Sequence, residues 1–159
     1  MKVRSIAYLL FFILLSQMAG IIGSFFTFDS IGSWYAYLER PSFAPPNWIF
    51  GPVWITLYAL MGIAAYIVWE KGWKTQEVKF ALGWFGAQLV LNALWSIIFF
   101  GLQSPGPAFI EILILWAAIA MTIMSFGRLS RNAAWLLVPY ILWVSFAAIL
   151  NFSIWLLNP

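Results

Sequence analysis

The sequence contains neither cysteine nor histidine, and it carries very few charges. Without cysteine it can form no disulfides, thiolate metal sites or iron–sulfur centres, and it has no thiol nucleophile. Without histidine it lacks the commonest general base, zinc ligand and haem axial ligand. Charged residues make up 8% of the 159 residues, whereas a soluble domain has about 25%. These absences exclude a soluble enzyme and predict an integral membrane protein. The net charge of +3 does not indicate a nucleic-acid partner, because in a membrane chain the position of each charge matters more than the sum.

Hydrophobic residues make up 64% of the chain, and they lie in long uncharged runs. A helix that crosses the hydrocarbon needs about 20 mostly apolar residues, and the turn signal at 104–107 divides one of the runs into two. A β-barrel would require strands that alternate polar and apolar residues, which these runs do not show. We therefore expect one all-α transmembrane domain over 1–159, a bundle of five helices. The expected helices cover 5–27, 47–69, 80–103, 107–127 and 133–157.

Lysine and arginine are distributed unevenly between the two sides of such a bundle. One side has Arg40 alone, and the other has Lys2, Arg4, Lys71, Lys74, Lys79, Arg128 and Arg131. The positive-inside rule then predicts that the N-terminus lies in the cytoplasm and the C-terminus across the membrane. Lys2 and Arg4 before an apolar run are also typical of a signal peptide. The run over 5–28 is longer than the roughly 7–15 apolar residues of such a peptide, which favours a retained helix.

The first loop, over 29–48, is rich in aromatic residues and proline rather than in serine, glycine and charges. Ser33 is expected to cap a short helical turn that runs to Leu38, with Pro41 ending it. The loop fits two interpretations. It is either an aromatic belt at the membrane interface or a semi-rigid lid over the bundle, and the composition does not decide between them.

Polar and aromatic residues recur at helical spacing inside three expected spans. They are Trp54 and Tyr58 on the second helix, Trp84, Gln88, Asn92, Trp95 and Ser96 on the third, and Tyr140, Trp143, Ala147 and Asn151 on the fifth. Interhelical hydrogen bonds, worth about 0.6 kcal/mol each, would explain one or two polar residues. Several indoles beside amides and phenols favour a flat apolar cavity with a few orienting groups.

Three further features have competing interpretations. Glu111 on the fourth helix is either a capping or hydrogen-bonding group or a proton relay. Two small-residue stripes predict close helix packing first and a homodimer face second. The stripes are Ser16, Gly20 and Ser24 on the first helix, and Gly83 and Ala87 on the third.

Four stretches between Gly32 and Asn151 follow, in order and spacing, a pattern that resembles the translocator protein family, the tryptophan-rich sensory proteins once called peripheral benzodiazepine receptors. The stretches are Trp34-Tyr35-x-x-Leu38-x-Arg40-Pro41-Ser42-Phe43-x-Pro45-Pro46-x-Trp48, Gly51-Pro52-Val53-Trp54-x-x-Leu57-Tyr58, Gln88-Leu89-x-Leu91-Asn92-x-x-Trp95 and Pro139-Tyr140-x-x-Trp143-x-x-Phe146-Ala147-x-x-Leu150-Asn151. The resemblance implies a five-helix bundle, commonly dimeric, with a ligand cavity under the first loop. It implies porphyrin or haem as the ligand, sterols in animal members, and synthetic benzodiazepine-site drugs.

The resemblance also implies roles for individual residues. It places Trp34 and Tyr35 in the lid, and it matches Glu111 to a position that is usually acidic. The remaining family cavity positions are Trp54, Asn92, Trp95, Trp143, Ala147 and Leu150. The family's proposed cholesterol motif is absent, because its positions hold Phe152 and Leu156. By the resemblance, this favours a prokaryotic-type member and hence a bacterial cell membrane.

Three functions follow in order of preference. The first is binding of porphyrin-type tetrapyrroles as a sensor, scavenger or regulator, with no cofactor required and the macrocycle rather than the iron recognised. The second is light- and oxygen-dependent porphyrin degradation that would use Trp54 and Trp143, since the sequence has no conventional catalytic constellation. The third is transport. The candidate ligand-binding residues are Trp34, Tyr35, Trp54, Tyr58, Gln88, Asn92, Trp95, Tyr140, Trp143, Ala147, Leu150 and Asn151.

Overall fold

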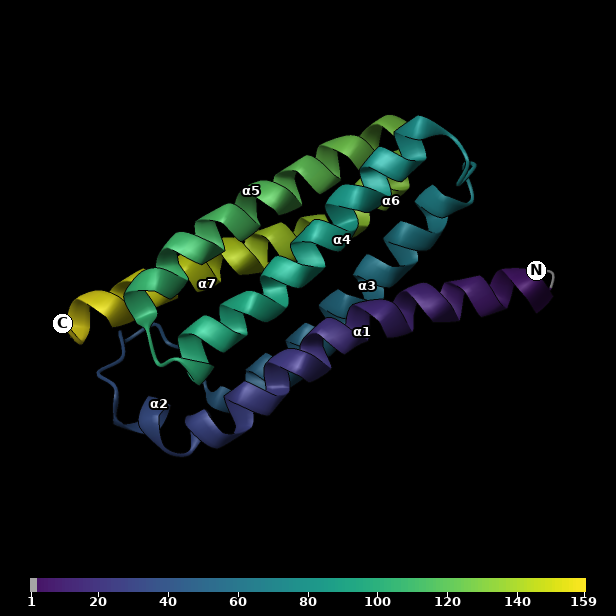
Figure 1. The fold of residues 1–159 in the computed structure, drawn as a ribbon. Helices are drawn as coiled ribbons and strands as arrows, with labels where there is room; N and C mark the ends of the chain where they lie inside the picture. Colours follow the sequence, from purple (N-terminus) through teal and green to yellow (C-terminus); the bar gives the residue numbers. More distant parts are fainter. Residues whose placement is uncertain (1–2) are drawn as a thin grey trace.

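Residues 3–159 are described by a computed structural model, in which antiparallel helices run side by side along one axis (Figure 1). Lys2, one of the residues used to assign the orientation, lies outside this range. The helical elements are α1 (Val3–Ile31), α2 (Trp34–Tyr37), the 3₁₀ turn η1 (Asn47–Ile49), α3 (Phe50–Trp69), α4 (Gln76–Ser96), the π-helical turn η2 (Ile97–Gly101), α5 (Pro105–Leu129), α6 (Arg131–Leu136) and α7 (Val138–Leu157).

Five helical segments in the described residues are long and apolar enough to cross a membrane. They are Ser5–Ile31, Asn47–Trp69, Gln76–Gly101, Pro105–Leu129 and Arg131–Leu157. At 1.5 Å per residue, each can span the hydrocarbon core of about 30 Å. The five-helix membrane bundle expected from the sequence is therefore confirmed, and this arrangement leaves the two termini at opposite ends of the bundle (Figure 1).

Several helix ends differ from those expected by two to four residues, and three of them have a clear physical reason. α1 continues through Ile31, beyond the charged Asp29, since a helix end at the interface can expose a charge to water. α4 begins at Gln76 instead of 80 for the same reason. α5 begins at Pro105, because proline fits the first helical turn, where its missing N–H would have no partner. Charged and proline residues therefore end the uncharged runs before they end the helices.

The fifth span is made of two helices rather than one. Pro139 has no backbone N–H to donate, so the chain bends at Leu137, between α6 and α7. Ser130 caps α6, where its hydroxyl oxygen accepts from the N–H of Ala133 at 3.4 Å. The bend lies at the end of the bundle away from the first loop (Figure 1). After this bend, α7 runs along α5 toward the first loop.

α1 and α3 approach most closely where a glycine removes the side chain. A Cβ on Gly62 would lie 2.5 Å from the Cα of Ile13, so the two backbones touch there. The ring of Tyr58 lies directly against Gly20, about two turns further along α1. Ser16, between these two contacts, is fully buried. The small-residue stripe on α1 is therefore used for packing within the chain, as its first interpretation predicts.

Candidate ligand cavity

The first loop folds back onto the end of the bundle. Tyr35 is buried, and its ring lies 6.3 Å from that of Phe99 and 5.7 Å from that of Phe100. Tyr37 and Phe43 stay exposed on the outer surface. The loop is therefore a lid on its inner side, while its outer aromatic residues remain available to the membrane interface. The lid interpretation therefore fits the inner residues of the loop, while an interfacial belt formed by the outer residues stays a prediction.

The helical turn in the lid occurs where the sequence predicts it, but its capping differs. α2 covers Trp34–Tyr37 and ends before Pro41. Ser33 occupies the N-cap position without capping the turn with its side chain. Its hydroxyl instead donates to the carbonyl oxygen of Asp29 at 2.5 Å, which satisfies the free end of α1. The predicted capping role of Ser33 is therefore wrong, because the end of the longer helix competes for the same hydroxyl.

Two sets of contacts hold the lid in place. The side-chain amide of Asn158 pairs with the backbone of Glu39, accepting from its N–H and donating to its carbonyl oxygen, both at 3.0 Å. Arg40 donates to Oδ1 of Asn47 at 3.3 Å, and its guanidinium carbon lies 5.5 Å from the centre of the Tyr35 ring. Burial raises the pKa of Tyr35, and the nearby Arg40 charge partly offsets this effect. The lid thus connects to the end of α7 and to η1, which precedes α3.

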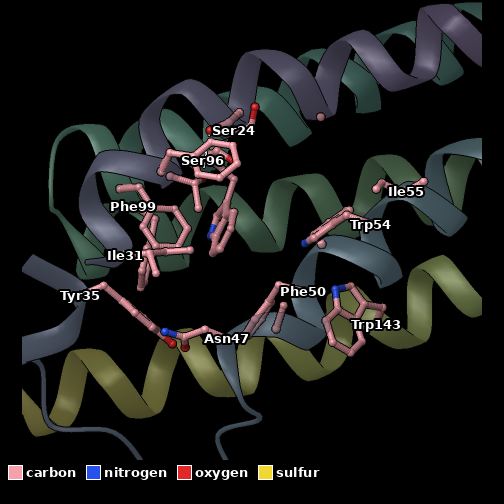
Figure 2. A pocket seen from close by; sticks show the side chains of 18 of the residues that line it. Ser24, Ile31, Tyr35, Asn47, Phe50, Trp54, Ile55, Ser96, Phe99 and Trp143 are labelled. Carbon is pink, nitrogen blue, oxygen red and sulfur yellow. Dashed lines mark hydrogen bonds between the residues drawn. The ribbon is translucent and has the colours of Figure 1, made fainter. Parts of the chain in front are cut away.

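Below the lid lies a cavity of about 510 Å³, surrounded by α1, α3, α4, η2 and α7 (Figure 2). This volume lies within the range of about 300–1,000 Å³ typical of small-molecule sites. Aromatic rings form much of its wall. Trp54 stacks on Tyr58 with ring centres 5.4 Å apart, and Trp95 stacks on Phe99 at 5.1 Å. The space is therefore apolar and bordered by flat faces.

Eight of the twelve candidate ligand-binding residues line this cavity. They are Tyr35, Trp54, Tyr58, Trp95, Trp143, Ala147, Leu150 and Asn151. They come from the lid and from three helices that are distant in sequence. Whether they contact a ligand stays a prediction, but the structure places their side chains around one space.

The other four candidates lie behind the cavity wall. Trp34 packs on Phe99 at 5.7 Å. Asn92 accepts from the hydroxyl of Tyr58 and donates to Tyr140 at 3.0 Å, and Tyr140 donates to Gln88 at 2.8 Å. This network joins α3, α4 and α7. Gln88, Asn92 and Tyr140 therefore act as interhelical hydrogen-bonding groups, the alternative considered for the polar stripe.

Asn151 belongs to the cavity wall and to a second set of hydrogen bonds. Its Oδ1 accepts from Nε1 of Trp95 at 3.0 Å, and its Nδ2 donates to the carbonyl oxygen of Pro105 at 2.7 Å. These bonds fix the indole of Trp95 against the cavity and connect α7 with the start of α5. The two interpretations of the polar stripes, hydrogen bonding between helices and a ligand cavity, therefore apply together.

Two buried polar groups in the described residues have no hydrogen-bond partner. One is the carboxyl group of Glu111, which is 6% exposed and does not line the cavity. The expectation of a capping or hydrogen-bonding role for Glu111 is wrong, since neither oxygen is bonded. The other is Nε1 of Trp143, in a residue that does line the cavity. This indole N–H is therefore a donor without a partner in the structure, and the nitrogen atom itself is buried.

α1 contributes a wall that the polar stripes of the other helices did not predict. Its residues in the cavity include Gln17, Gly20, Ser24, Thr27 and Ile31. They recur every three or four positions, as one face of a helix does. The helical spacing of Gln17, Ser24 and Thr27 was a detectable signal, but the small-residue stripe on this helix was assigned only to helix packing or to a homodimer face.

The fold and the cavity together define a class of protein: a five-helix membrane protein with an aromatic ligand cavity under a loop that acts as its lid. Comparison with protein-family models matches residues 12–156 to the TspO/MBR family. The chain belongs to the TspO/MBR family.

Individual relatives agree over most of the chain. It is 50% identical over 140 residues to the tryptophan-rich protein TspO of Archaeoglobus fulgidus, covering 87% of this chain and 89% of that protein. It is 40% identical over 145 residues to the translocator protein of Homo sapiens, covering 91% and 86%. It is 37% identical over 125 residues to the tryptophan-rich sensory protein of Cereibacter sphaeroides, covering 79% and 77%. The sequence resemblance is thereby confirmed.

Proposed function

We propose that this protein binds porphyrin-type tetrapyrroles in the cavity under its lid and acts as a sensor, scavenger or regulator of them. The observation that supports this most is the composition of the cavity wall, in which indole and phenyl faces from four helices surround an apolar space (Figure 2). A flat macrocycle can stack on such faces, and each aromatic contact adds about 0.5–1.5 kcal/mol beyond the area that it buries.

The proposed site recognises the ring rather than the iron. The chain has no histidine or cysteine, and Tyr58, a cavity phenol, has its hydroxyl committed to Asn92. The free indole N–H of Trp143 can donate to an acceptor on the ligand. We therefore expect metal-free protoporphyrin to bind about as tightly as haem.

A titration of intrinsic tryptophan fluorescence tests this proposal in detergent micelles or lipid vesicles. The probes are metal-free protoporphyrin and haem. Replacement of Trp143 by leucine should weaken both about two- to tenfold, since one aromatic contact is lost. Trp135→Leu is the matched control, because Trp135 is exposed on α6 and does not line the cavity. If Trp143→Leu binds each probe as tightly as Trp135→Leu does, the proposal is contradicted. A strong requirement for iron would contradict it as well.

A second candidate function is light- and oxygen-dependent degradation of bound porphyrin. Trp54 and Trp143 both line the cavity, so a photosensitising ligand there would lie beside two oxidisable indoles. Illuminated, aerated protein should then consume porphyrin, with molecular oxygen as the oxidant, and Trp143→Phe should slow the loss. Equal bleaching by the Trp54/Trp143 double variant would dismiss this candidate. Transport, the third candidate, predicts porphyrin flux across proteoliposome membranes.

The orientation and the oligomeric state stay predictions. The lysine and arginine count predicts that the lid lies outside the cytoplasm, and the absent cholesterol motif favours a bacterial cell membrane. Thiol labelling of a cysteine placed at Lys74 from either side of the membrane would test the orientation. For the homodimer, the stripe on α4 is available, since Gly83 and Ala87 are exposed and a Cβ on Gly83 would meet no other atom within 4 Å. Crosslinking in native membranes would show whether that face joins two copies.

A further inference from the structure

α1 changes its neighbour along its length. Up to Gly20 it lies against α3, where Ile13 meets Gly62 and Gly20 meets Tyr58. From Gly23 onward it lies against the end of α4 and the turn that follows it. There a Cβ on Gly23 would lie 2.8 Å from the hydroxyl of Ser96. Further on, the hydroxyl of Ser30 donates to the carbonyl oxygen of Phe100 at 2.7 Å. α1 and α3 therefore diverge toward the lid.

This divergence leaves one side of the cavity without a wall. Four residues line the cavity and are nevertheless strongly exposed at its edge: Ile21 (54%) and Phe28 (78%) on α1, and Trp48 (73%) and Ile55 (62%) on η1 and α3. A residue that lines a cavity and also faces outward marks an opening. We call the opening between residues 21–28 and 48–55 the side slit.

The inner part of the side slit, at Ile21 and Ile55, lies at the depth of the hydrocarbon, whereas Phe28 and Trp48 lie near the lid end of their spans. Ile55 is eight residues inside the span Asn47–Trp69, and Ile21 is ten residues from the end of the span Ser5–Ile31. At 1.5 Å per residue these positions are about 12–15 Å from the lid end of their helices. The hydrocarbon core is about 30 Å thick. What touches the slit from outside is therefore lipid.

The chemistry of the slit also fits lipid. None of the residues that line the cavity carries a charge. At its inner end the slit is closed by a hydrogen bond between the helices, from Nε2 of Gln17 to the carbonyl oxygen of Ile55 at 2.9 Å. At its outer end lies the lid, held by Asn158 and Arg40. The aqueous end of the cavity is thus covered, while the side toward the acyl chains is open.

We propose that the cavity opens sideways into the bilayer between α1 and α3, so that flat apolar ligands dissolved in the membrane enter through the side slit. A phospholipid acyl chain occupies the slit when no ligand is bound. The identity of the ligand rests on the proposed function, whereas the opening itself does not. The lid then remains closed during binding.

The first test needs no porphyrin. Because the chain has no cysteine, a single cysteine at Ser24 can carry a nitroxide spin label without background labelling. In phosphatidylcholine vesicles, we expect this label to collide as readily with dissolved oxygen as one at Ile110, an exposed residue of α5 that does not line the cavity. It should be shielded from a water-soluble nickel chelate that reaches a label at Lys74. If the nickel chelate reaches the label at Ser24, the proposal is overturned. Shielding of this label from both reagents would also overturn it, because the slit would then be covered, for example by a second copy of the chain.

The second test compares the two routes into the cavity. A bismaleimide joins Ser24→Cys to Gly51→Cys across the slit, and in a separate variant it joins Glu39→Cys to Asn158→Cys at the lid. We expect the slit crosslink to slow association of metal-free protoporphyrin from vesicles about tenfold or more, with dissociation slowed as well. The lid crosslink should leave both rates unchanged.

The reverse pattern would overturn the proposal in favour of entry under the lid. Each variant before crosslinking is the control for its own substitutions, and far-UV circular dichroism confirms that it is folded. If uncrosslinked variants and the original chain all fail to bind protoporphyrin, the proposed function fails. The spin-label result then still decides whether the slit opens to lipid.

Discussion

Asn92 joins three helices behind the cavity wall, and its replacement by leucine removes two hydrogen bonds at once. The Oδ1 of Asn92 accepts from Tyr58 on α3, and its Nδ2 donates to Tyr140 on α7 at 3.0 Å. Interhelical hydrogen bonds in membrane proteins contribute about 0.6 kcal/mol each on average. The two bonds together therefore stabilise the bundle by about 1.2 kcal/mol.

The two phenols respond differently to the loss of the amide. Tyr140 still donates to Gln88 at 2.8 Å, so its hydroxyl keeps a partner. Tyr58 loses its acceptor while its ring remains buried, and an unsatisfied buried donor costs about 1–3 kcal/mol. We expect Asn92→Leu to lower the free energy of unfolding by about 1–3 kcal/mol, and most of this loss to come from Tyr58.

This reasoning makes the double variant the decisive measurement. In Tyr58→Phe/Asn92→Leu no hydroxyl is left without a partner, so the double variant should be at least as stable as Asn92→Leu. Reversible unfolding in mixed micelles of dodecyl maltoside and dodecyl sulfate, followed by circular dichroism, gives the free energies. If the losses of the two single variants simply add in the double variant, the two residues are not coupled and the network does not operate as described.

The structure yields two further predictions besides those attached to the proposals above. Gly62→Ala should destabilise the bundle by about 1–3 kcal/mol through overpacking against Ile13, whereas Gly83→Ala, at an open position, should not, as equilibrium unfolding of both variants will show. Asn158→Ala should free the lid, and we expect faster hydrogen exchange at the amide of Glu39. Exchange at that amide as slow as in the original chain would show that other contacts hold the lid.

The spans were predictable because their signal is local. In the hydrocarbon a backbone must satisfy its own hydrogen bonds, so an uncharged run of sufficient length becomes a helix regardless of its neighbours. The exact ends of the helices were less predictable. The first turn of a helix can contain proline, as at Pro105, and the interface can solvate a charge, as at Asp29.

The roles within the polar stripes depended on three-dimensional contacts. Helical spacing predicted that Gln88, Asn92 and Trp95 lie in the bundle interior, but it could not determine which of them line the cavity. Asn92 and Gln88 form hydrogen bonds with phenol groups on other helices, and a hydrogen bond to Asn151 fixes the indole of Trp95 at the cavity. Each outcome depends on residues far away in the sequence.

The sequence by itself determined the class of protein, the five spans, the family and the absence of cysteine and histidine chemistry. It did so because composition, run length and motif spacing are properties of the chain alone. Only the tertiary structure decided that Ser33 bonds to α1, that Glu111 has no partner and that α1 turns away from α3 to open the side slit. These features are set by competition between groups from different helices. Only the folded bundle brings those groups within hydrogen-bonding or packing distance.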